Sequence, residues 1–179
     1  LINAHPLQKP YVVKPINEGS SIGVYFVNPL KDPPLDLSSD MSSILMVEEY
    51  IPGRELTVTV MGKKALLVTD IITQKWYDYD AKYKNGGSLH EVPAKIPEKI
   101  EEKCLEYALS AHELIGCRGI SRADFRWDES LGLDGLILLE INTQPGMTPT
   151  SLAPEQAEIC GIKFGDLCQW LVEDASCDR

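Results

Sequence analysis

The sequence predicts an α+β fold in two parts: a sheet-rich lobe over residues 1–55, and a larger lobe of mixed or antiparallel sheet with helices over residues 56–179. Three observations predict it. Short β-rich runs separated by turn residues recur within the first 72 positions. One amphipathic helical pattern begins at Pro97, and two further strand-like runs follow it, over residues 119–127 and 136–142.

Three strands are predicted in the first lobe. The β-branched run Tyr-Val-Val-Lys lies between Pro10 and Pro15, residues 24–27 follow a loop of small residues, and residues 44–49 precede the turn at Pro52-Gly53. Residues 28–43 are rich in Pro, Asp and Ser and show no clear period over most of their length, although a short helix over residues 36–43 is compatible with them.

The second lobe is predicted to begin with a β-hairpin. Apolar and polar side chains alternate over residues 55–61, and residues 65–72 follow as the partner strand. Residues 74–88 are polar, aromatic and glycine-containing. A loop of this length in a compact domain is usually a lid or a binding loop, and we expect it to be mobile.

The clearest helix is predicted after this loop. Pro97 suits the first turn and Gly116 suits the position after the last turn. Between them one apolar stripe runs along the helix: Ile100, Cys104, Ala108, Ala111 and Ile115. Two short closing helices are predicted over residues 154–159 and 164–173.

The two strands after the helix carry the most informative polar residues. Because side chains alternate across a strand, Arg122, Asp124 and Arg126 are expected to share one face, opposite Ser121, Ala123, Phe125 and Trp127. On the next strand the same alternation groups Leu136, Leu138, Glu140 and Asn142 against Ile137, Leu139 and Ile141. If the strands pair as a hairpin, Asp124 lies beside Glu140 and Asn142.

This convergence of two carboxylates and one amide oxygen suits a divalent cation, because magnesium prefers hard oxygen ligands that it shares with substrate phosphates. Glu140 follows the run Leu-Ile-Leu-Leu, which has the composition of a buried strand, and a metal would supply the countercharge that a buried carboxylate needs. The alternative is a surface hairpin in which Arg122 and Asp124 form a solvated pair. The following Asn-Thr-Gln-Pro-Gly favours the metal site.

Three weaker signals lie in the first lobe. Lys14, at the end of an apolar strand, can reach a phosphate, or it is an ordinary edge-strand lysine. The small-residue run 19–23 can bind an anion through its amides, or it is a plain hairpin turn. Residues 47–55 can offer backbone groups to an adenine and a carboxylate to a ribose, or they form an acidic loop. Neither a Walker A loop nor Gly-x-Gly-x-x-Gly is present.

The composition excludes several classes of function. A net charge of −10 argues against a nucleic-acid-binding surface, and no apolar run is long enough to cross a membrane. The five cysteines form no Cys-x-x-Cys pair and do not cluster with His5, His90 and His112, which favours a reduced, cytoplasmic location over a zinc site. Because no Met stands at position 1, we interpret the chain as part of a longer protein.

Taken together, these motifs resemble the D-alanine–D-alanine ligase family of the ATP-grasp superfamily, in order and spacing over essentially the whole chain. The matching stretches are Val-Val-Lys-Pro-x-x-Glu-Gly-Ser-Ser-Ile-Gly (12–23), Glu-Glu-Tyr-Ile-Pro-Gly-Arg-Glu (48–55), Tyr-Asp-Tyr-Asp-Ala-Lys-Tyr (77–83), Gly-Ile-Ser-Arg-Ala-Asp (119–124) and Leu-Glu-Ile-Asn-Thr-Gln-Pro-Gly-Met-Thr (139–148). The resemblance implies an ATP-grasp fold, with part of the small lobe and the large C-terminal lobe present.

The resemblance also implies roles for individual residues. The nucleotide-binding set is Lys14, Ser20, Ser21, Glu48, Glu49, Tyr50, Ile51, Glu55 and Lys82, with Glu48 on the adenine side and Glu55 at the ribose. Two Mg2+ or Mn2+ ions are implied on Asp124, Glu140 and Asn142. The implied catalytic and substrate-binding residues are Arg122 and Gly146 at an oxyanion site, Ser20, Tyr83, and Ser151 with Leu152 at the carboxylate of the second amino acid.

The implied activity is the ATP-dependent joining of two D-alanines through an acyl phosphate, for peptidoglycan synthesis, by a cytoplasmic homodimer that binds no nucleic acid and no membrane. The alternatives are another ATP-grasp carboxylate–amine ligase and a non-catalytic nucleotide-binding module. Since the family's first lobe is absent from the 179 residues, we expect them to be inactive alone.

Overall fold

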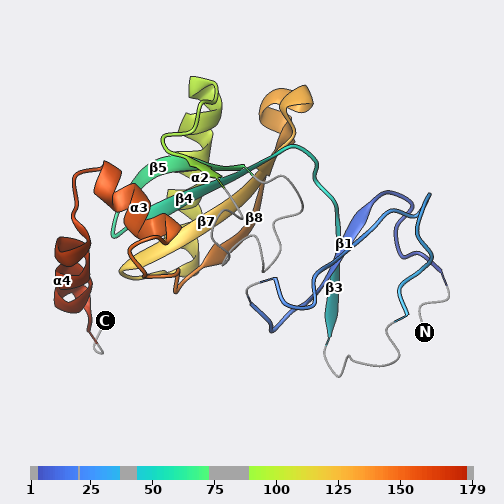
Figure 1. Cartoon of the computed structure of the whole chain (residues 1–179), viewed down its shortest axis with the longest axis horizontal. Helices are drawn as coiled ribbons and strands as arrows, with labels where there is room; N and C mark the ends of the chain where they lie inside the picture. Colours follow the sequence, from blue (N-terminus) through green and yellow to red (C-terminus); the bar gives the residue numbers. More distant parts are fainter. Residues whose placement is uncertain (1–3, 20, 37–43, 73–88, 177–179) are drawn as a thin grey trace. The chain divides into compact units, whose positions relative to one another are not determined.

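The computed structural model describes residues 4–19, 21–36, 44–72 and 89–176. These residues belong to two compact units, one ending at Ile51 and the other comprising Pro52–Ile72 and the chain from Leu89 onward (Figure 1). The lobe limits predicted from the sequence, 1–55 and 56–179, stay a prediction. The loop 74–88 and most of the helix considered over 36–43 lie outside the described residues.

The first unit holds a three-stranded antiparallel sheet in the order β2-β1-β3. Its strands are β1 (Tyr11–Pro15), β2 (Tyr25–Val27) and β3 (Leu45–Glu49), which confirms the three predicted strands. Alternation along β1 gives the sheet two different faces. One face is buried around Tyr11, Val13 and Val27, and the other carries Val12 and Lys14.

The second unit holds a five-stranded antiparallel sheet in the order β6-β5-β4-β7-β8. Its strands are β4 (Arg54–Met61), β5 (Lys64–Ile72), β6 (Leu89–Glu91), β7 (Ile120–Trp127) and β8 (Leu136–Asn142). The predicted hairpins β4–β5 and β7–β8 are both confirmed, and a 3-10 helix, η1 (Glu129–Gly135), joins the second pair.

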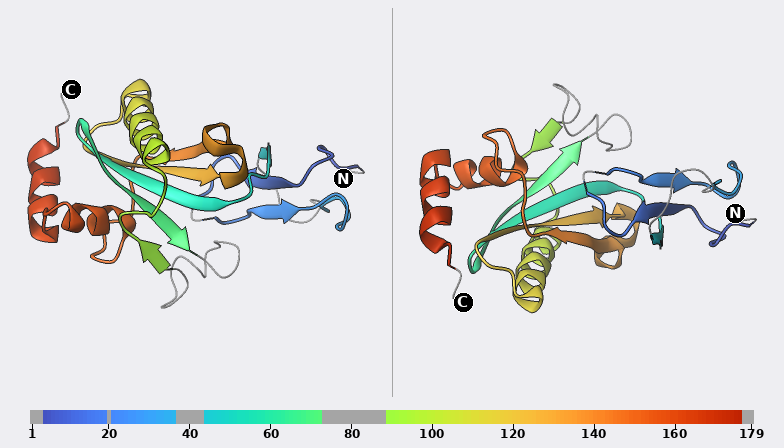
Figure 2. Two further views of the ribbon diagram at one scale, coloured as in Figure 1. Left: turned by 90° about the horizontal axis from the view of Figure 1, so that it is seen from above. Right: turned by 90° about the horizontal axis from the view of Figure 1, so that it is seen from below.

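Helices pack on both faces of this sheet (Figure 2). Helix α2 (Glu98–Ile115) covers one face, with Ile100, Cys104 and Ala108 packed among the inward side chains of β4, β5 and β7. The helix ends at Gly116, whose φ of 73° is the left-handed conformation that favours glycine, as the sequence predicts. No helix among the described residues is long and apolar enough to cross a membrane.

The opposite face is covered at one end by α3 (Leu152–Ile159), against which α4 (Phe164–Asp174) packs. A second apolar cluster joins these helices to the sheet: Leu66, Ile120, Ala153, Ala157 and Leu167. The remainder of this face carries the polar side chains of β7, so α3 lies beside the polar residues that the sequence singles out.

Strict alternation along β8 is wrong, because the strand contains a β-bulge. Asp124 pairs with Glu140 and Phe125 pairs with Leu138, which leaves Leu139 without a partner. Leu138 therefore lies on the core face, whereas Glu140 lies on the polar face. The predicted burial of Glu140 is wrong for the same reason, since its side chain is exposed.

Candidate functional site

The polar face of the second unit brings together the residues that the sequence predicts to bind metal. The register of β7 and β8 places Arg122 opposite Asn142 and Asp124 opposite Glu140, and directly paired residues of antiparallel strands point to the same side of the sheet. On β4, the other neighbour of β7, Thr57 pairs with Asp124 and points to the same face. One sheet face therefore holds two carboxylates, an amide, a guanidinium and a hydroxyl.

Asp124 is the most firmly held of these groups. Its Oδ1 accepts hydrogen bonds from Arg122 Nε at 2.8 Å and from Thr57 Oγ1 at 2.6 Å, and its Oδ2 accepts one from Arg122 Nη2 at 2.8 Å. The side chain is only 17% exposed. Two parallel bonds from a planar guanidinium fix both the position and the orientation of a carboxylate, so Asp124 and Arg122 act as one rigid unit.

Glu140 and Asn142 complete the oxygen-bearing set. Glu140 is exposed, and the Oδ1 atom of Asn142 accepts a hydrogen bond from the backbone amide of Gln144 at 3.2 Å. Among the described residues no three His, Cys, Asp or Glu side chains cluster closely enough to hold a metal by themselves. The set nevertheless suits magnesium, which commonly takes one or two carboxylates and completes its shell with water and substrate phosphates.

The loop after β8 brings Gly146 close to Ser151. A Cβ atom at position 146 would lie 2.9 Å from Ser151 Oγ, so a side chain there would require Ser151 to move. Ser151 Oγ also accepts a hydrogen bond from the amide of Thr148 at 3.1 Å and lies 2.7 Å from Thr148 Oγ1. Leu152, buried, then begins α3. Gly146, Ser151 and Leu152 are therefore neighbours at one end of this helix.

Glu55 lies further along the polar face. Arg126 Nη1 donates to Glu55 Oε2 at 3.4 Å, and Ile137 pairs opposite Arg126 on the next strand. Ile137 is 39% exposed and adds apolar surface beside Arg126, and the unpaired Leu139 is 38% exposed. Sequence reasoning missed both residues, because strict alternation assigned them to the face opposite Glu140.

The first unit brings Lys14 and Glu48 together. The Lys14 Nζ atom lies 2.6 Å from Glu48 Oε2, on the face opposite the buried core of this sheet. Tyr50 follows β3 and packs edge-on against Phe26, with ring centroids 4.8 Å apart. Glu49 points to the other face and pairs with Lys9 at 2.8 Å, so its side chain does not join Glu48.

The structure shows fewer contacts for the remaining residues that are predicted to bind the nucleotide. Ser21 has a positive φ of 59°, within a turn closed by a hydrogen bond from the amide of Ile22 to Gly19 O at 3.0 Å. Ile51, half-buried, ends the first unit. Ser20, Lys82 and Tyr83 lie outside the described residues.

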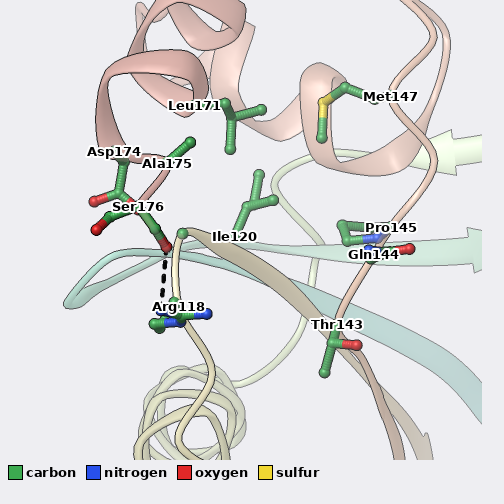
Figure 3. A pocket seen from close by; sticks show the side chains of 11 residues that line it. Arg118, Ile120, Thr143, Gln144, Pro145, Met147, Leu171, Asp174, Ala175 and Ser176 are labelled. Atoms are coloured by element: carbon green, nitrogen blue, oxygen red, sulfur yellow. Dashed lines mark hydrogen bonds between the residues drawn. The ribbon is translucent and has the colours of Figure 1, made fainter. Parts of the chain in front are cut away.

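A pocket of about 400 Å³ lies elsewhere in the second unit, between the start of β7, the loop after β8 and the end of α4 (Figure 3). Arg118 lines it and donates to the carbonyl of Ser176 at 3.4 Å, with Ile120, Met147 and Leu171 around it. Not one of the predicted site residues lines this pocket. The polar face of β7 and β8 therefore remains the better candidate on chemical grounds.

Two titratable residues of α2, Cys104 and His112, are buried between this helix and the sheet. Burial raises the pKa of the Cys104 thiol to about 12, so this thiol stays protonated and unreactive. Burial also lowers the pKa of His112, partly offset by Glu113, and the ring bonds to Ser121 Oγ at 2.7 Å. Both residues lie on the side of the sheet away from the candidate site.

Comparison with solved structures defines the fold class. The chain superimposes on the D-alanine–D-alanine ligase of Bacillus anthracis complexed with ATP with a TM-score of 0.68 and 26% identity, over 92% of this chain and 52% of that one. The ligase of Coxiella burnetii gives 0.70 at 24% identity, over 92% and 44% of the two chains. The fold is thus the α+β ATP-grasp fold.

The family follows from the sequence comparisons. The family model described as D-ala D-ala ligase C-terminus matches residues 3–173, so the chain belongs to this family. It is 65% identical to the D-alanine–D-alanine ligase of Ruegeria pomeroyi over 176 residues, and 61% identical to that of a Jannaschia species over 184 residues. These alignments cover 98% and 100% of this chain but 58% of each relative, so the chain spans little more than half their length.

Proposed function

We propose that the chain provides the metal-binding, oxyanion and acceptor residues, and part of the nucleotide site, of an ATP-dependent ligase that joins two D-alanines into D-alanyl-D-alanine for peptidoglycan synthesis. The observation that carries this proposal is the register of β7 and β8, which puts Arg122, Asp124, Glu140 and Asn142 on one face of one sheet. Membership of the ligase family and the names of the relatives support the same reaction.

In this proposal each predicted nucleotide-binding residue has one role. Lys14, Ser20, Ser21 and Lys82 bind the phosphates, the segment Glu48–Ile51 binds the adenine, and Glu55 binds the ribose. The contact between Lys14 and Glu48 supports the assignment, because it holds a cation and a carboxylate on the sheet face that also carries Phe26, the ring partner of Tyr50.

Asp124, Glu140 and Asn142 would hold two Mg2+ or Mn2+ ions, which when bound neutralise charge on the transferred phosphoryl group. The donors that surround Asp124 support this role. Arg122 and Thr57 direct three hydrogen bonds to its two oxygens, which keeps the carboxylate in one orientation before any ion arrives. A metal ligand held in this way loses little conformational entropy on binding.

The reaction proceeds in two steps. The carboxylate of the first D-alanine attacks the γ-phosphate, which gives an acyl phosphate and ADP. The amine of the second D-alanine then attacks the acyl carbon, and phosphate leaves. Negative charge develops on the carbonyl oxygen, where Arg122 and the amide of Gly146 are proposed to donate, while Ser151 and Leu152 position the acceptor carboxylate and Tyr83 is an additional catalytic residue.

A chimera tests the proposal: this chain replaces the matching segment of the Ruegeria pomeroyi relative. With ATP, magnesium and D-alanine, we expect the chimera to release ADP and form the dipeptide. Asp124→Asn should reduce turnover at least a hundredfold (an order-of-magnitude expectation), whereas Asp166→Asn, on the exposed side of α4, should leave it unchanged. An inactive parent chimera, or a fully active Asp124→Asn variant, would contradict the assignment.

The proposal also covers the location, the oligomeric state and the partners of the protein. The full-length protein is a cytoplasmic homodimer with no nucleic-acid or membrane partner, and the 179 residues alone make no dipeptide. Dipeptide synthesis by the isolated chain would contradict the last point. Profiling the chimera with other amino acids and with hydroxy acids as acceptors distinguishes D-alanine from the substrates of another carboxylate–amine ligase. Nucleotide binding without any turnover would instead indicate a non-catalytic module.

A further inference from the structure

The pairing of β4 with β5 is interrupted at Thr59, which has no partner on β5, although it pairs with Arg122 on β7. Val58 pairs with Val68 and Val60 pairs with Ala65, so Leu66 and Leu67 lie together opposite Thr59. Thr59 is fully buried. Its backbone amide therefore needs a hydrogen-bond acceptor other than β5, because a buried amide without one destabilises the fold.

Gln156 of α3 supplies that acceptor. Its Oε1 accepts from the amide of Thr59 at 2.9 Å, and its Nε2 donates to Thr57 O at 3.2 Å and to Thr69 Oγ1 at 2.8 Å. The side chain is completely buried, and both of its N–H groups and its oxygen are used. Such a fully bonded buried amide tolerates very little displacement, so it fixes the helix on the sheet in one position and rotation.

The same contacts continue to the candidate site. Thr57, whose carbonyl accepts from Gln156, donates its hydroxyl to Asp124 Oδ1 at 2.6 Å, and Asp124 holds Arg122. In the other direction, Gln156 lies about one helical turn after Ser151 and Leu152, at the start of α3. Gln156 thus connects the end of α3 nearest Gly146 with the strand that carries Arg122 and Asp124.

A second contact holds the same helix from a different strand. Glu155, the neighbour of Gln156, pairs with His90 of β6 at 2.8 Å. This pair is partly exposed, whereas the three bonds of Gln156 are buried and reach the central strand β4 directly. Gln156 is therefore the buried polar contact between α3 and the central strand, beside the apolar contacts of Ala153 and Ala157.

We propose that Gln156 is a positioning residue that sets the distance between the acceptor-binding end of α3, at Ser151 and Leu152, and the Arg122–Asp124 pair. It thereby determines whether the acyl phosphate is captured by the amine of the second amino acid or by water. The inference rests on the proposed ligase reaction. A displacement of about 1 Å between reacting groups can cost about a hundredfold in rate, so a residue that touches no substrate can control this partition.

The test compares two Gln156 variants in the chimera with a control. Gln156→Glu keeps an acceptor for Thr59 but loses both donations, and Gln156→Met keeps the shape but loses all three bonds. Ile100→Ala, in α2 on the other face of the sheet, removes a buried side chain without touching α3. ADP release and dipeptide formation are measured together with the KM values for ATP and D-alanine.

We expect both Gln156 variants to raise the ratio of ADP released to dipeptide formed and the KM for D-alanine, each by roughly tenfold or more, with the KM for ATP changed by less than about twofold. Ile100→Ala should lower stability and leave the ratio unchanged. A ratio equal to that of the parent in the Gln156 variants, or an equal increase in Ile100→Ala, would overturn the proposal.

A second measurement does not require activity. In amide NMR spectra of the 179-residue chain, Gln156→Met should shift the resonances of Gly146, Ser151 and Leu152, whereas Ile100→Ala should not. Unshifted resonances in Gln156→Met would refute the positioning role. An inactive parent chimera would count against the ligase proposal alone, because the spectra still decide whether Gln156 positions this end of α3.

Discussion

Gly53 offers a direct test of how β4 begins against β7. Its φ is 94°, and a Cβ atom built on it would lie 2.1 Å from the carbonyl oxygen of Trp127 and 3.0 Å from the Cα atom of Asp128. The obstacle is backbone, which cannot rotate away as a flexible side chain can. We therefore expect Gly53→Ala to force β4 and β7 apart at the point where Arg54 and Glu55 enter the sheet.

The expected loss of stability has two parts. A positive φ costs a non-glycine residue about 1–2 kcal/mol. Forcing extra volume into a packed contact costs about 1–3 kcal/mol more. Gly53→Ala should therefore lower the free energy of unfolding by about 2–5 kcal/mol. Gly116 provides the matched control, because its φ is 73° and no atom lies within 4 Å of a Cβ built there. Its replacement by Ala should cost only the first part.

Urea unfolding of the chain, followed by tryptophan fluorescence, measures both losses. Trp127 and Trp170 report on the second unit, where both glycines lie. The slope of free energy against urea should be unchanged, and the midpoint should fall further for Gly53→Ala than for Gly116→Ala. Equal midpoints in the two variants would show that the close approach to Trp127 does not exist in solution.

Three further predictions concern buried polar groups, and urea unfolding measures each. Because burial lowers the pKa of His112, the unfolded state takes up the proton first as pH falls below about 6.5, so stability should fall there, and less so in His112→Gln. The buried Thr59 hydroxyl has no hydrogen-bond partner within the described chain, so Thr59→Val should raise stability by about 1 kcal/mol. Arg54 holds the buried Asp70 at 2.7 Å, so Arg54→Met should cost about 3 kcal/mol, partly recovered by adding Asp70→Asn.

The sequence predicts the regular parts of this fold well because they repeat a period. Alternation locates β4 and β7 to within a residue or so, and the apolar stripe of Ile100, Cys104 and Ala108 locates α2 with its end at Gly116. These elements have one apolar face and one polar face, so the pattern in the sequence is also the pattern of burial. The shared face of Arg122 and Asp124 follows from the same period.

A periodic pattern does not predict which side chains of different elements contact each other. Gln156 was not singled out from the sequence, although it lies on the same stripe of α3 as Ala153 and Ala157, both buried. A polar residue at an apolar position of a helix is the signal that could have found it. Its three partners on β4 and β5 could not be found in this way, because they depend on the interrupted pairing at Thr59.

The bulge in β8 has a physical cause that the composition of the strand contains. If the pairing of Phe125 with Leu138 continued regularly, Glu140 would pair with Ala123 and enter the core beneath α2. Burying a carboxylate without a partner costs several kcal/mol or more, whereas a lost strand hydrogen bond costs roughly 1 kcal/mol net. The arrangement that leaves Leu139 unpaired therefore has the lower free energy. It moves Glu140 and Asn142 to the face of Asp124, so the irregularity that defeats the alternation rule is also what assembles the candidate site.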